Sequence, residues 1–580
     1  MFNSLGSYRR SLTRYESALA YAALGVAAGL LSGAVVIAFE HSIEQLALLW
    51  GVGDRAEGFE ALPSVQRFAI PVVGALLLGI GFSMLRPEDR EVGIVHVISR
   101  LYSNYGMLPW RNAVVQFFGG AIALASGQSG GREGPGVHLG GAITSLVGQR
   151  LALPNNSLRV LIACGSAGGI AAAFNTPLAG VIFAMEVIVS EYTVAGFMPV
   201  MLSAVAASVL SHRLGGGTEI FELSGVQLGS LGEIPAILVL GLMCGIAAGL
   251  VIRLSSLSAR LAHWPVVVRF TLAGALTGGL GVFLPQVIGI GYDTLELVIF
   301  GDVAIQLLLL IAGAKLVATA VSVGFGMPIG LIGPNLLIGA CLGGFFGSAV
   351  NIWFPGMAAD ITLYVMIGMG ASMGAVFAAP LAASLAVIEL TQSTGVAMPA
   401  LLAIIVAHLT NLVIFRQRSA HRSVLRQLRR QLPDDPLSQL LHRTDVNAVM
   451  DGSVVVVNEQ LRPAVARTLS LQVPKWCLIN RDGENLFLVD GRELMDWVES
   501  QEQFDVADDL SLSITESTLR RWTIAIVPEQ ANLRQVLDIL HARTVEAVCV
   551  YTRPAGGKRV LRGIVTRDRI ERFTLDSLNA

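Results

Sequence analysis

The chain has 580 residues, of which 53% are hydrophobic and only 14% are charged. Soluble domains contain about 25% charged residues, so this composition excludes a wholly soluble protein. The net charge is −2, and nothing in the charge pattern points to nucleic acid as a partner. Residues 1–430 carry 23 basic and 20 acidic residues, whereas residues 431–580 carry 17 and 22. This shift predicts a transmembrane domain at 1–430 and a soluble tail at 431–580.

Apolar segments interrupted by Gly or Pro run along the first part, and no cleavable signal precedes them. They lie at 17–39, 68–85, 112–126, 137–153, 159–189, 194–211, 234–255, 267–289, 304–323, 335–353, 363–389 and 396–415. A simple helical span needs about 20 residues, and these lengths vary around that value. We therefore expect an all-α polytopic membrane protein with tilted and broken helices around a cavity.

Basic residues flank this part of the chain at both ends. They are Arg9, Arg10 and Arg14 before the first segment, and Arg416, Arg418, Arg422, Arg426, Arg429 and Arg430 after the last. Positive flanks stay on the cytoplasmic side of a membrane. Both termini and the tail are therefore predicted to lie in the cytoplasm, beneath the inner cell membrane.

One stretch of the membrane part occurs twice. Gly131-Arg132-Glu133-Gly134-Pro135, followed by Gly140 and Gly148, matches Gly330-Leu331-Ile332-Gly333-Pro334, followed by Gly339 and Gly347. A second block, Gly165, Phe174, Pro177, Leu178, Ala179 and Glu186, matches Gly368, Phe377, Pro380, Leu381, Ala382 and Glu389. Helix packing through small residues repeats glycines, but not prolines and a glutamate in the same order. Two homologous halves in inverted arrangement are therefore predicted, at about 17–212 and 234–416.

The repeated motif has the composition of an anion site. Pro135 and Pro334 suit the first turn of a helix, where no amide hydrogen is needed. Upstream glycines let backbone amides approach a ligand closely. Helix N-termini offer unpaired N–H groups and a positive dipole end. A carboxylate at Glu133 occupies the same potential, so it should compete with the anion and accept a proton once displaced.

The GREGP motif at 131–135, the later G-x-x-G-P and the stretch from Leu161 to Glu186 resemble the CLC chloride channel and transporter family. The resemblance covers about residues 17–430. It implies transport of chloride or a similar anion by a homodimer with one pore per subunit, without a metal or an enzymatic reaction. It also implies that Glu133 is the gate and proton acceptor, and that Leu331 and Ile332 face the anion through their amides. The alternative for Glu133 is a surface acid that pairs with Arg132.

Three positions depart from the family pattern. Val92 and Gly93 align with a Gly-Ser-Gly-x-Pro segment, and Val92 lacks the hydroxyl that would contact chloride. His421 aligns with a pore-lining tyrosine, although a solvated histidine in an arginine-rich linker is the alternative. Val187 stands where exchangers of the family often have a proton-relay glutamate. Glu186, just before it, is a candidate for a proton path, although local hydrogen bonding is the interpretation we favour.

Two mechanisms within the resemblance stay open. Val187 favours a channel-like or atypically proton-coupled protein, and conventional exchange of protons for chloride is the alternative. Outside the family, an ion-coupled solute carrier is a further alternative, while an intramembrane enzyme lacks its usual Ser/His, HExxH or paired-aspartate signature. The five scattered cysteines, with no CxxC pair, are expected to be small buried hydrophobic residues.

The tail also repeats, at an offset of 72 residues. Leu461, Val473 and Cys477 match Leu533, Val545 and Cys549. Two units at about 443–500 and 517–576 are predicted, each with helices and strands in the same order. They resemble a pair of CBS domains, modules that sense adenine nucleotides in many proteins. Thr566 and Asp568 are weak candidates for such binding because the acid lies one place early, and a purely structural tail that dimerises is the alternative.

Overall fold

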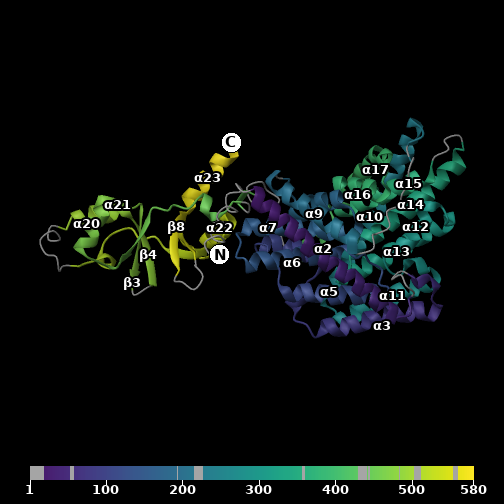
Figure 1. Cartoon of the computed structure of the whole chain (residues 1–580), viewed down its shortest axis with the longest axis horizontal. Coiled ribbons are helices and arrows are strands. Elements are labelled where there is room, and N and C mark those ends of the chain that lie inside the picture. The colour runs from purple at the N-terminus through teal and green to yellow at the C-terminus, as the bar shows by residue number, and fades with distance from the viewer. Residues whose placement is uncertain are drawn as a thin grey trace. The chain divides into compact units, whose positions relative to one another are not determined.

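The computed structural model describes residues 18–52, 58–192, 194–214, 226, 228–355, 360–428, 440–441, 444–481, 484–501, 511–552 and 559–579. The chain divides into two compact units. A helical unit contains residues 17–151 and 158–432, and a smaller α/β unit contains residues 433–580 together with 152–157 and 1–16 (Figure 1). The flanking Arg9, Arg10, Arg14, Arg429 and Arg430, and the predicted boundary at 430/431, lie outside the described residues.

The helical unit contains two series of helices in matching order. The first series is α2 (Ala18–Leu49), α3 (Ser64–Ser83), α4 (Gly93–Ser103), α5 (Trp110–Ala125), α6 (Glu133–Arg150), α7 (Asn155–Phe174), α8 (Pro177–Phe183), the π-helical turn η3 (Ala184–Val189) and α9 (Val194–Leu214). The second series is α10 (Ile234–Ala259), α11 (Val266–Phe283), α12 (Tyr292–Phe300), α13 (Ile305–Gly324), α14 (Ile332–Trp353), α15 (Ile361–Phe377), α16 (Pro380–Thr391) and α17 (Ala397–Thr410), followed by η8 (Asn411–Phe415) and α18 (Ala420–Gln427).

Several of these helices are suited to a membrane. Among the described residues, nine helices are long and apolar enough to span one. Large apolar side chains also cover outward faces, as at Leu77, Phe118 and Leu310. Exposed apolar surface on this scale requires a lipid or protein neighbour rather than water. The protein is therefore a multi-pass membrane protein, as predicted.

Two predicted apolar segments are each broken into two helices. The segment 159–189 is broken after α7, at Asn175, and the segment 363–389 is broken after α15, at Ala378. Both residues adopt a left-handed φ of 55°. Pro177 and Pro380 then begin α8 and α16, where a missing amide hydrogen costs nothing. The sequence pattern overlooked three further helices, α4, α12 and α18, because they are too short to register as spans.

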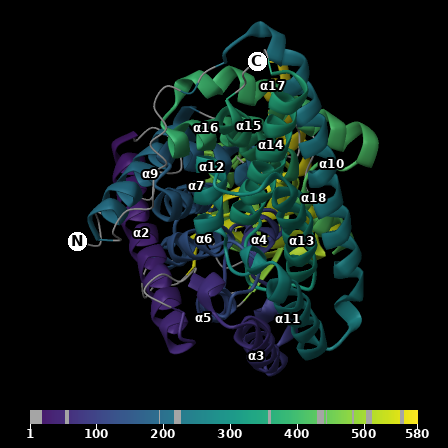
Figure 2. The ribbon, with the colours of Figure 1, turned by 90° about the vertical axis from the view of Figure 1, so that its right-hand side faces the viewer.

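The two series are related by an inverted repeat. Helix α2 packs on α9, and α10 packs on α17. Corresponding helices also pack on each other, as α3 does on α11 and α8 does on α16. In Figure 2, α2 and α10 lie at opposite edges of the unit while α3 and α11 lie together. The predicted all-α fold with two inverted halves is confirmed.

Repeated glycines hold equivalent helices together in the two halves. A Cβ on Gly140 would lie 2.1 Å from the carbonyl oxygen of Gly165, between α6 and α7. A Cβ on Gly339 would lie 2.1 Å from the carbonyl oxygen of Gly368, between α14 and α15. No side chain fits at that distance. These four glycines therefore serve close helix packing. The glycines within 131–135 and 330–334 have a different role.

The smaller unit contains two modules of the same order. The first is β1 (Val454–Asn458), β2 (Gln460–Leu461), α20 (Pro463–Leu471), β3 (Trp476–Arg481), β4 (Glu484–Asp490) and α21 (Gly491–Glu499). Strand β5 (Leu512–Ser513) pairs antiparallel with β2 and belongs to the first module. The second module is β6 (Ile524–Pro528), α22 (Leu533–Ala542), β7 (Ala547–Thr552), β8 (Val560–Thr566) and α23 (Arg567–Asn579). The sheets have the orders β1-β3-β4 and β6-β7-β8, each with one parallel and one antiparallel pair. In both modules a helix connects the two parallel strands, and an antiparallel strand and a second helix follow.

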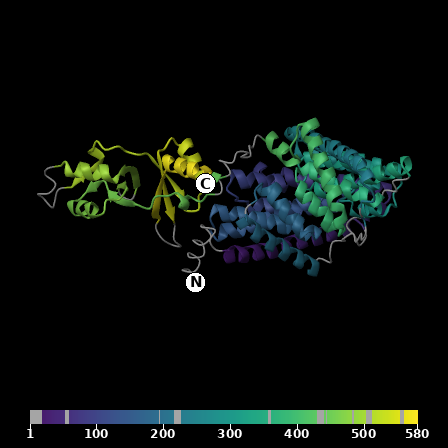
Figure 3. The ribbon, with the colours of Figure 1, turned by 90° about the horizontal axis from the view of Figure 1, so that it is seen from above.

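The two modules share a core where their sheets meet. Trp476, Leu478 and Leu488 of the first sheet cluster with Cys549 and Ile564 of the second. Figure 3 shows the strands of the two modules side by side, green in the first and yellow in the second. All five cysteines of the chain are buried and free, as predicted. Apolar contact between the sheets makes the pair a single folded unit.

Candidate anion and proton site

The two copies of the repeated motif pair with each other. The amide of Gly131 donates to the carbonyl of Gly330 at 2.8 Å, and the amide of Gly330 donates to that of Gly131 at 2.7 Å. This isolated antiparallel bridge lies just before α6 and α14. A Cβ on Gly330 would lie 2.7 Å from the amide nitrogen of Gly134, so a side chain is excluded. The bridge brings the N-termini of both helices to one place.

Glu133 is the first residue of α6, and its carboxylate lies at the start of α14. The side chain is fully buried. Its Oε2 accepts from the amide of Gly333 at 3.4 Å, and its Oε1 accepts from the hydroxyl of Tyr292. The carboxylate therefore occupies the positive end of the other half's helix, where an anion would otherwise bind.

Tyr292 owes its position to a tight turn and a buried lysine. Gly291 has a φ of 95°, which an L side chain rarely adopts, and caps α12. Nζ of the fully buried Lys315 donates to the carbonyls of Val287 at 3.0 Å and Gly289 at 2.8 Å. The ammonium group thus holds the turn that presents Tyr292 to Glu133. It also adds positive charge next to the site, which favours anions.

Glu133 is fully buried rather than a surface acid, and among the described residues the side chain of Arg132 contacts groups other than this carboxylate. Its Nε lies 3.3 Å from Oε1 of Glu40 on α2, and its guanidinium stacks 5.4 Å above the ring of Tyr292. A second contact goes from its Nη2 to the carbonyl of Ala173 at 3.1 Å. The side chain of Arg132 therefore braces the ring of Tyr292.

A cavity of about 650 Å³ opens beside the paired motifs. Its lining includes Gly134, Gly330 and Leu331, together with Gly93 and with Val92, which departs from the family pattern. These residues come from three segments that the sequence had suggested separately. The structure brings them together, while Ile332 and the two prolines are buried in the helix starts.

The amide of Gly93 is not offered to the cavity. It donates to Oε1 of Gln116 on α5 at 2.7 Å, and Nε2 of Gln116 donates to the carbonyl of Pro328 at 3.0 Å. Gln116 is fully buried and thereby ties the start of α4 to the second motif. The Gly93 amide is therefore already paired within the protein.

His421 lies on α18 and lines the same cavity. Its ring is buried and stacks against Phe377 at 5.3 Å between centroids. Its Nδ1 has no hydrogen-bond partner among the described residues. The geometry differs from that of a solvated linker histidine and leaves a polar atom for a ligand in the cavity.

Glu186 and Glu389 cap each other's neighbouring helices. The carboxylate of Glu186 accepts from the amides of Leu381 at 3.4 Å and Ala382 at 3.0 Å, at the start of α16. The carboxylate of Glu389 accepts from Leu178 at 2.9 Å and Ala179 at 2.7 Å, at the start of α8. This reciprocal arrangement accords with the local hydrogen-bonding role favoured for Glu186. Val187 follows it without a carboxylate.

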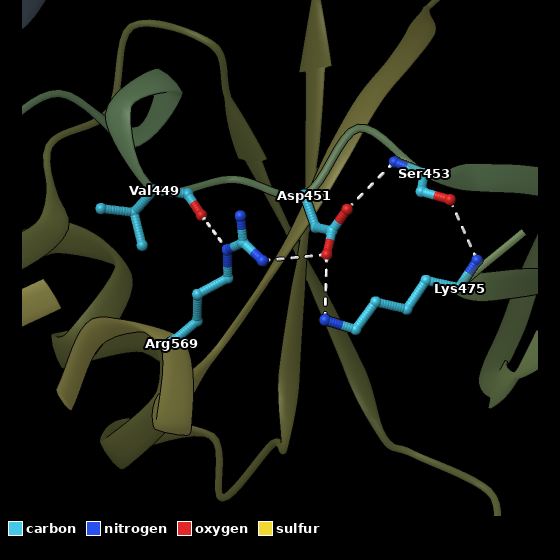
Figure 4. Close-up of polar contacts among 5 residues, drawn as sticks. All are labelled: Val449, Asp451, Ser453, Lys475 and Arg569. Carbon is cyan, nitrogen blue, oxygen red and sulfur yellow. Dashed lines mark hydrogen bonds and ion pairs between the residues drawn. The ribbon is translucent and has the colours of Figure 1, made fainter. Parts of the chain in front are cut away.

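The nucleotide candidates of the tail lie where β8 meets α23. Thr566 is the buried last residue of β8, and Asp568 lies in the first turn of α23. Arg569, the next residue, donates from Nη1 to Asp451 at 3.0 Å and from Nε to the carbonyl of Val449 at 2.5 Å (Figure 4). Lys475 contacts the same carboxylate at 3.1 Å. Burial raises the pKa of Asp451, but the Ser453 amide and these two cations outweigh burial and hold that pKa below its usual value.

A family model described as "Voltage gated chloride channel" matches residues 72–412. The chain belongs to this family, the CLC family. The match covers the motifs at 131–135 and 330–334, as well as Tyr292, Lys315 and Gln116. CLC proteins are anion channels and transporters rather than enzymes, so this chain mediates CLC-type anion transport. Family membership also sets aside the solute-carrier and intramembrane-enzyme alternatives.

Known CLC proteins resemble the chain over most of its length. A "Putative chloride channel protein ClcB-like" of Ralstonia nicotianae is 32% identical, over 68% of this chain and 93% of that protein. An "H(+)/Cl(-) exchange transporter ClcA" of Vibrio cholerae is 30% identical, over 73% of this chain and 89% of that protein.

Solved structures show the same fold. A slow cyanobacterial Cl−/H+ antiporter has a TM-score of 0.64 at 21% identity and covers 71% of this chain and 98% of its own. A eukaryotic CLC transporter has a TM-score of 0.59 at 19% identity and covers 95% of this chain and 97% of its own. The second likeness extends through the α/β unit.

Sequence reasoning missed three residues of the site: Tyr292, Gln116 and Lys315. The closely spaced Gly289 and Gly291 just before Tyr292 were the available signal, because such spacing marks a tight turn at a helix start. A lysine in an apolar helix was a second signal, since intramembrane charges are functional by default. Gln116 gave no signal, because nothing local distinguishes it from other polar residues in a membrane helix.

Proposed function

We propose that this protein exchanges chloride, or a similar small anion, for protons across a cell membrane. The observation that carries the proposal is the buried carboxylate of Glu133 on the amide of Gly333. An anion that reaches this amide has to displace the carboxylate, because both need the same donors. A displaced carboxylate in a poorly hydrated site readily accepts a proton. One side chain thereby links anion entry to proton uptake.

Exchange is favoured over passive conduction by the comparisons. The Vibrio cholerae relative and the cyanobacterial structure are both named for proton-coupled chloride transport. The apolar Val187 is the observation that favours a channel, the interpretation that the sequence had placed first. A related structure is named a fluoride/proton antiporter, so fluoride belongs among the anions to be tested.

Flux measurements in liposomes test the proposal. Purified protein is reconstituted with internal chloride, and valinomycin is added to start efflux while external pH is recorded. Chloride efflux with simultaneous proton uptake is expected; efflux without proton movement would identify a channel, and no anion flux would refute transport. Glu133→Gln should stop proton movement while anion flux survives. Glu44→Gln, which alters an exposed carboxylate on α2, is the matched control.

The assembly and the orientation are part of the same proposal. Resemblance to the CLC family supports a homodimer with one pore per subunit, and the arginines around the helical unit support cytoplasmic termini in an inner cell membrane. The repeated α/β modules support a pair of CBS domains in the tail. Because Arg569 stands where an acid for ribose is expected and pairs with Asp451, we propose a structural tail rather than a nucleotide sensor. Light scattering in detergent tests the dimer, and nucleotide titration of the full chain tests the tail.

A further inference from the structure

A second titratable cluster lies on α4 and α6, apart from Glu133. His96 and His138 are buried, with 1% and 0% of their surfaces exposed. Nδ1 of His96 lies 2.8 Å from Nε2 of His138. Ionisable residues within a membrane domain pair with one another and commonly form proton relays. The anion site described above uses neither ring.

Arg100 determines which nitrogen of each ring carries a proton. Its Nε donates to Nε2 of His96 at 3.2 Å, and a guanidinium has donors only. Neutral His96 therefore carries its proton on Nδ1 and donates it to Nε2 of His138. Neutral His138 then carries its proton on Nδ1, which has no hydrogen-bond partner among the described residues. The two rings form a directional hydrogen-bonded chain with a buried donor at its end.

This chain connects the cavity with α6. His96 and Glu91 both line the cavity, and Oε2 of Glu91 lies 4.0 Å from Nε2 of His96. His138 lies five residues after Glu133 on α6, about 7.5 Å along the helix axis. Ser166 carries a buried hydroxyl that also has no partner among the described residues, and a Cβ on Gly141 of α6 would lie 3.2 Å from it. Polar atoms therefore continue from the cavity wall into the interior.

Charged groups on the neighbouring elements contact several other partners. On elements next to α4, Glu186 binds the amides of α16 and His421 packs against Phe377, and α18 also carries Arg422 and Arg426.

On elements next to α6, Glu40 pairs with Arg132, His41 with Glu44, Arg111 with Asp89, and Arg159 with Glu191. Glu91 and Arg100 are charged groups whose contacts reach the histidine pair.

We propose that His96 and His138 are a proton-transfer pair between the cavity and α6, the helix that begins with Glu133. The inference rests on the proposed exchange of anions for protons. A proton from cavity water binds Nε2 of His96 once Arg100 has released it. The Nδ1 proton of His96 moves to Nε2 of His138, and the Nδ1 proton of His138 passes to water. One proton enters and one leaves, and both rings end neutral with the tautomers exchanged.

The test is paired chloride and proton flux from the full-length protein in liposomes. His138→Gln keeps a hydrogen-bonding side chain but cannot relay a proton. We expect proton flux to fall at least tenfold while chloride flux stays within about threefold of wild type. His96→Gln should give the same result, and it carries the test if His138→Gln does not fold. His41→Gln, an exposed histidine on α2, is the matched control.

Chemical rescue separates transfer from a merely structural role. Free imidazole in the medium should restore proton flux to His96→Ala, because His96 borders a cavity large enough to admit it, but not to His138→Gln. If the wild type couples proton flux to chloride flux, and His96→Gln and His138→Gln keep the same coupling, the proton-transfer pair is refuted while the exchange proposal stands. Wild-type chloride flux without proton movement would overturn the exchange proposal and the pair together.

Discussion

Replacing Tyr292 by Phe tests how the carboxylate of Glu133 is held. The substitution removes the hydroxyl that donates to Oε1 of Glu133. It keeps the ring, which contacts Arg132 at 5.4 Å and Phe174 at 6.1 Å. A hydrogen bond to a charged group contributes about 1.5–3 kcal/mol, and about 1.4 kcal/mol corresponds to a factor of ten. The ratio of docked to displaced carboxylate should therefore fall about 10- to 100-fold.

The expected readout is tighter anion binding. A docked carboxylate reduces the apparent anion affinity by the fraction of sites it occupies. Calorimetric titration of chloride into Tyr292→Phe should give an apparent Kd about tenfold or more below that of wild type. Tyr102→Phe is the control, since it removes a hydroxyl bond of 2.5 Å to the carbonyl of Val189 without affecting Glu133.

A double-mutant cycle identifies the route of the effect. In a Glu133→Ala background, Tyr292→Phe should leave chloride affinity unchanged, because there is no carboxylate to release. An equal change in both backgrounds would show that the phenol binds the anion directly. An unchanged affinity in the wild-type background would refute the docked carboxylate as a competitor.

Three further outcomes are expected. Gly131→Ala should expel the carboxylate of Glu133, because the Cβ of the new alanine would lie 2.0 Å from Oε2 of Glu133. Chloride flux should persist and lose most of its pH dependence. Gly313→Ala is the control and should behave as wild type, because the Cβ there meets open space. Glu389→Gln should weaken the cap on α8 and lower unfolding stability by about 1–2 kcal/mol in a denaturant series, with chloride flux per folded molecule unchanged. Burial raises the pKa of Asp445 from 3.8 to about 6. The folded state therefore binds this proton more tightly, and the stabilisation present below pH 3.8 is lost as pH rises through 6. Hydrogen exchange of residues 444–451 should therefore be slower at pH 5 than at pH 7, after correction for intrinsic rates. Asp445→Asn should abolish this difference.

Local patterns determined much of the fold in advance. Glycine and proline spacing predicted the inverted halves, because the same constraints on helix starts and close packing act in each copy. Charge density separated the apolar helices from the polar modules of the tail. GREGP identified Glu133, since a carboxylate beside a helix N-terminus has a chemical consequence that sequence alone displays.

Only the tertiary structure decided which groups meet. Glu133 and Tyr292 are separated by 159 residues, and no periodicity relates them. The bond from the Gly93 amide to Gln116 likewise depends on another helix, because an amide that looks free within its own segment can be paired from outside it. The two histidines lie 42 residues apart and were not connected by any motif. Backbone preferences act over a few residues and can therefore be predicted from the sequence. Contacts between helices depend on how whole helix faces pack, and this packing determines which groups form the site.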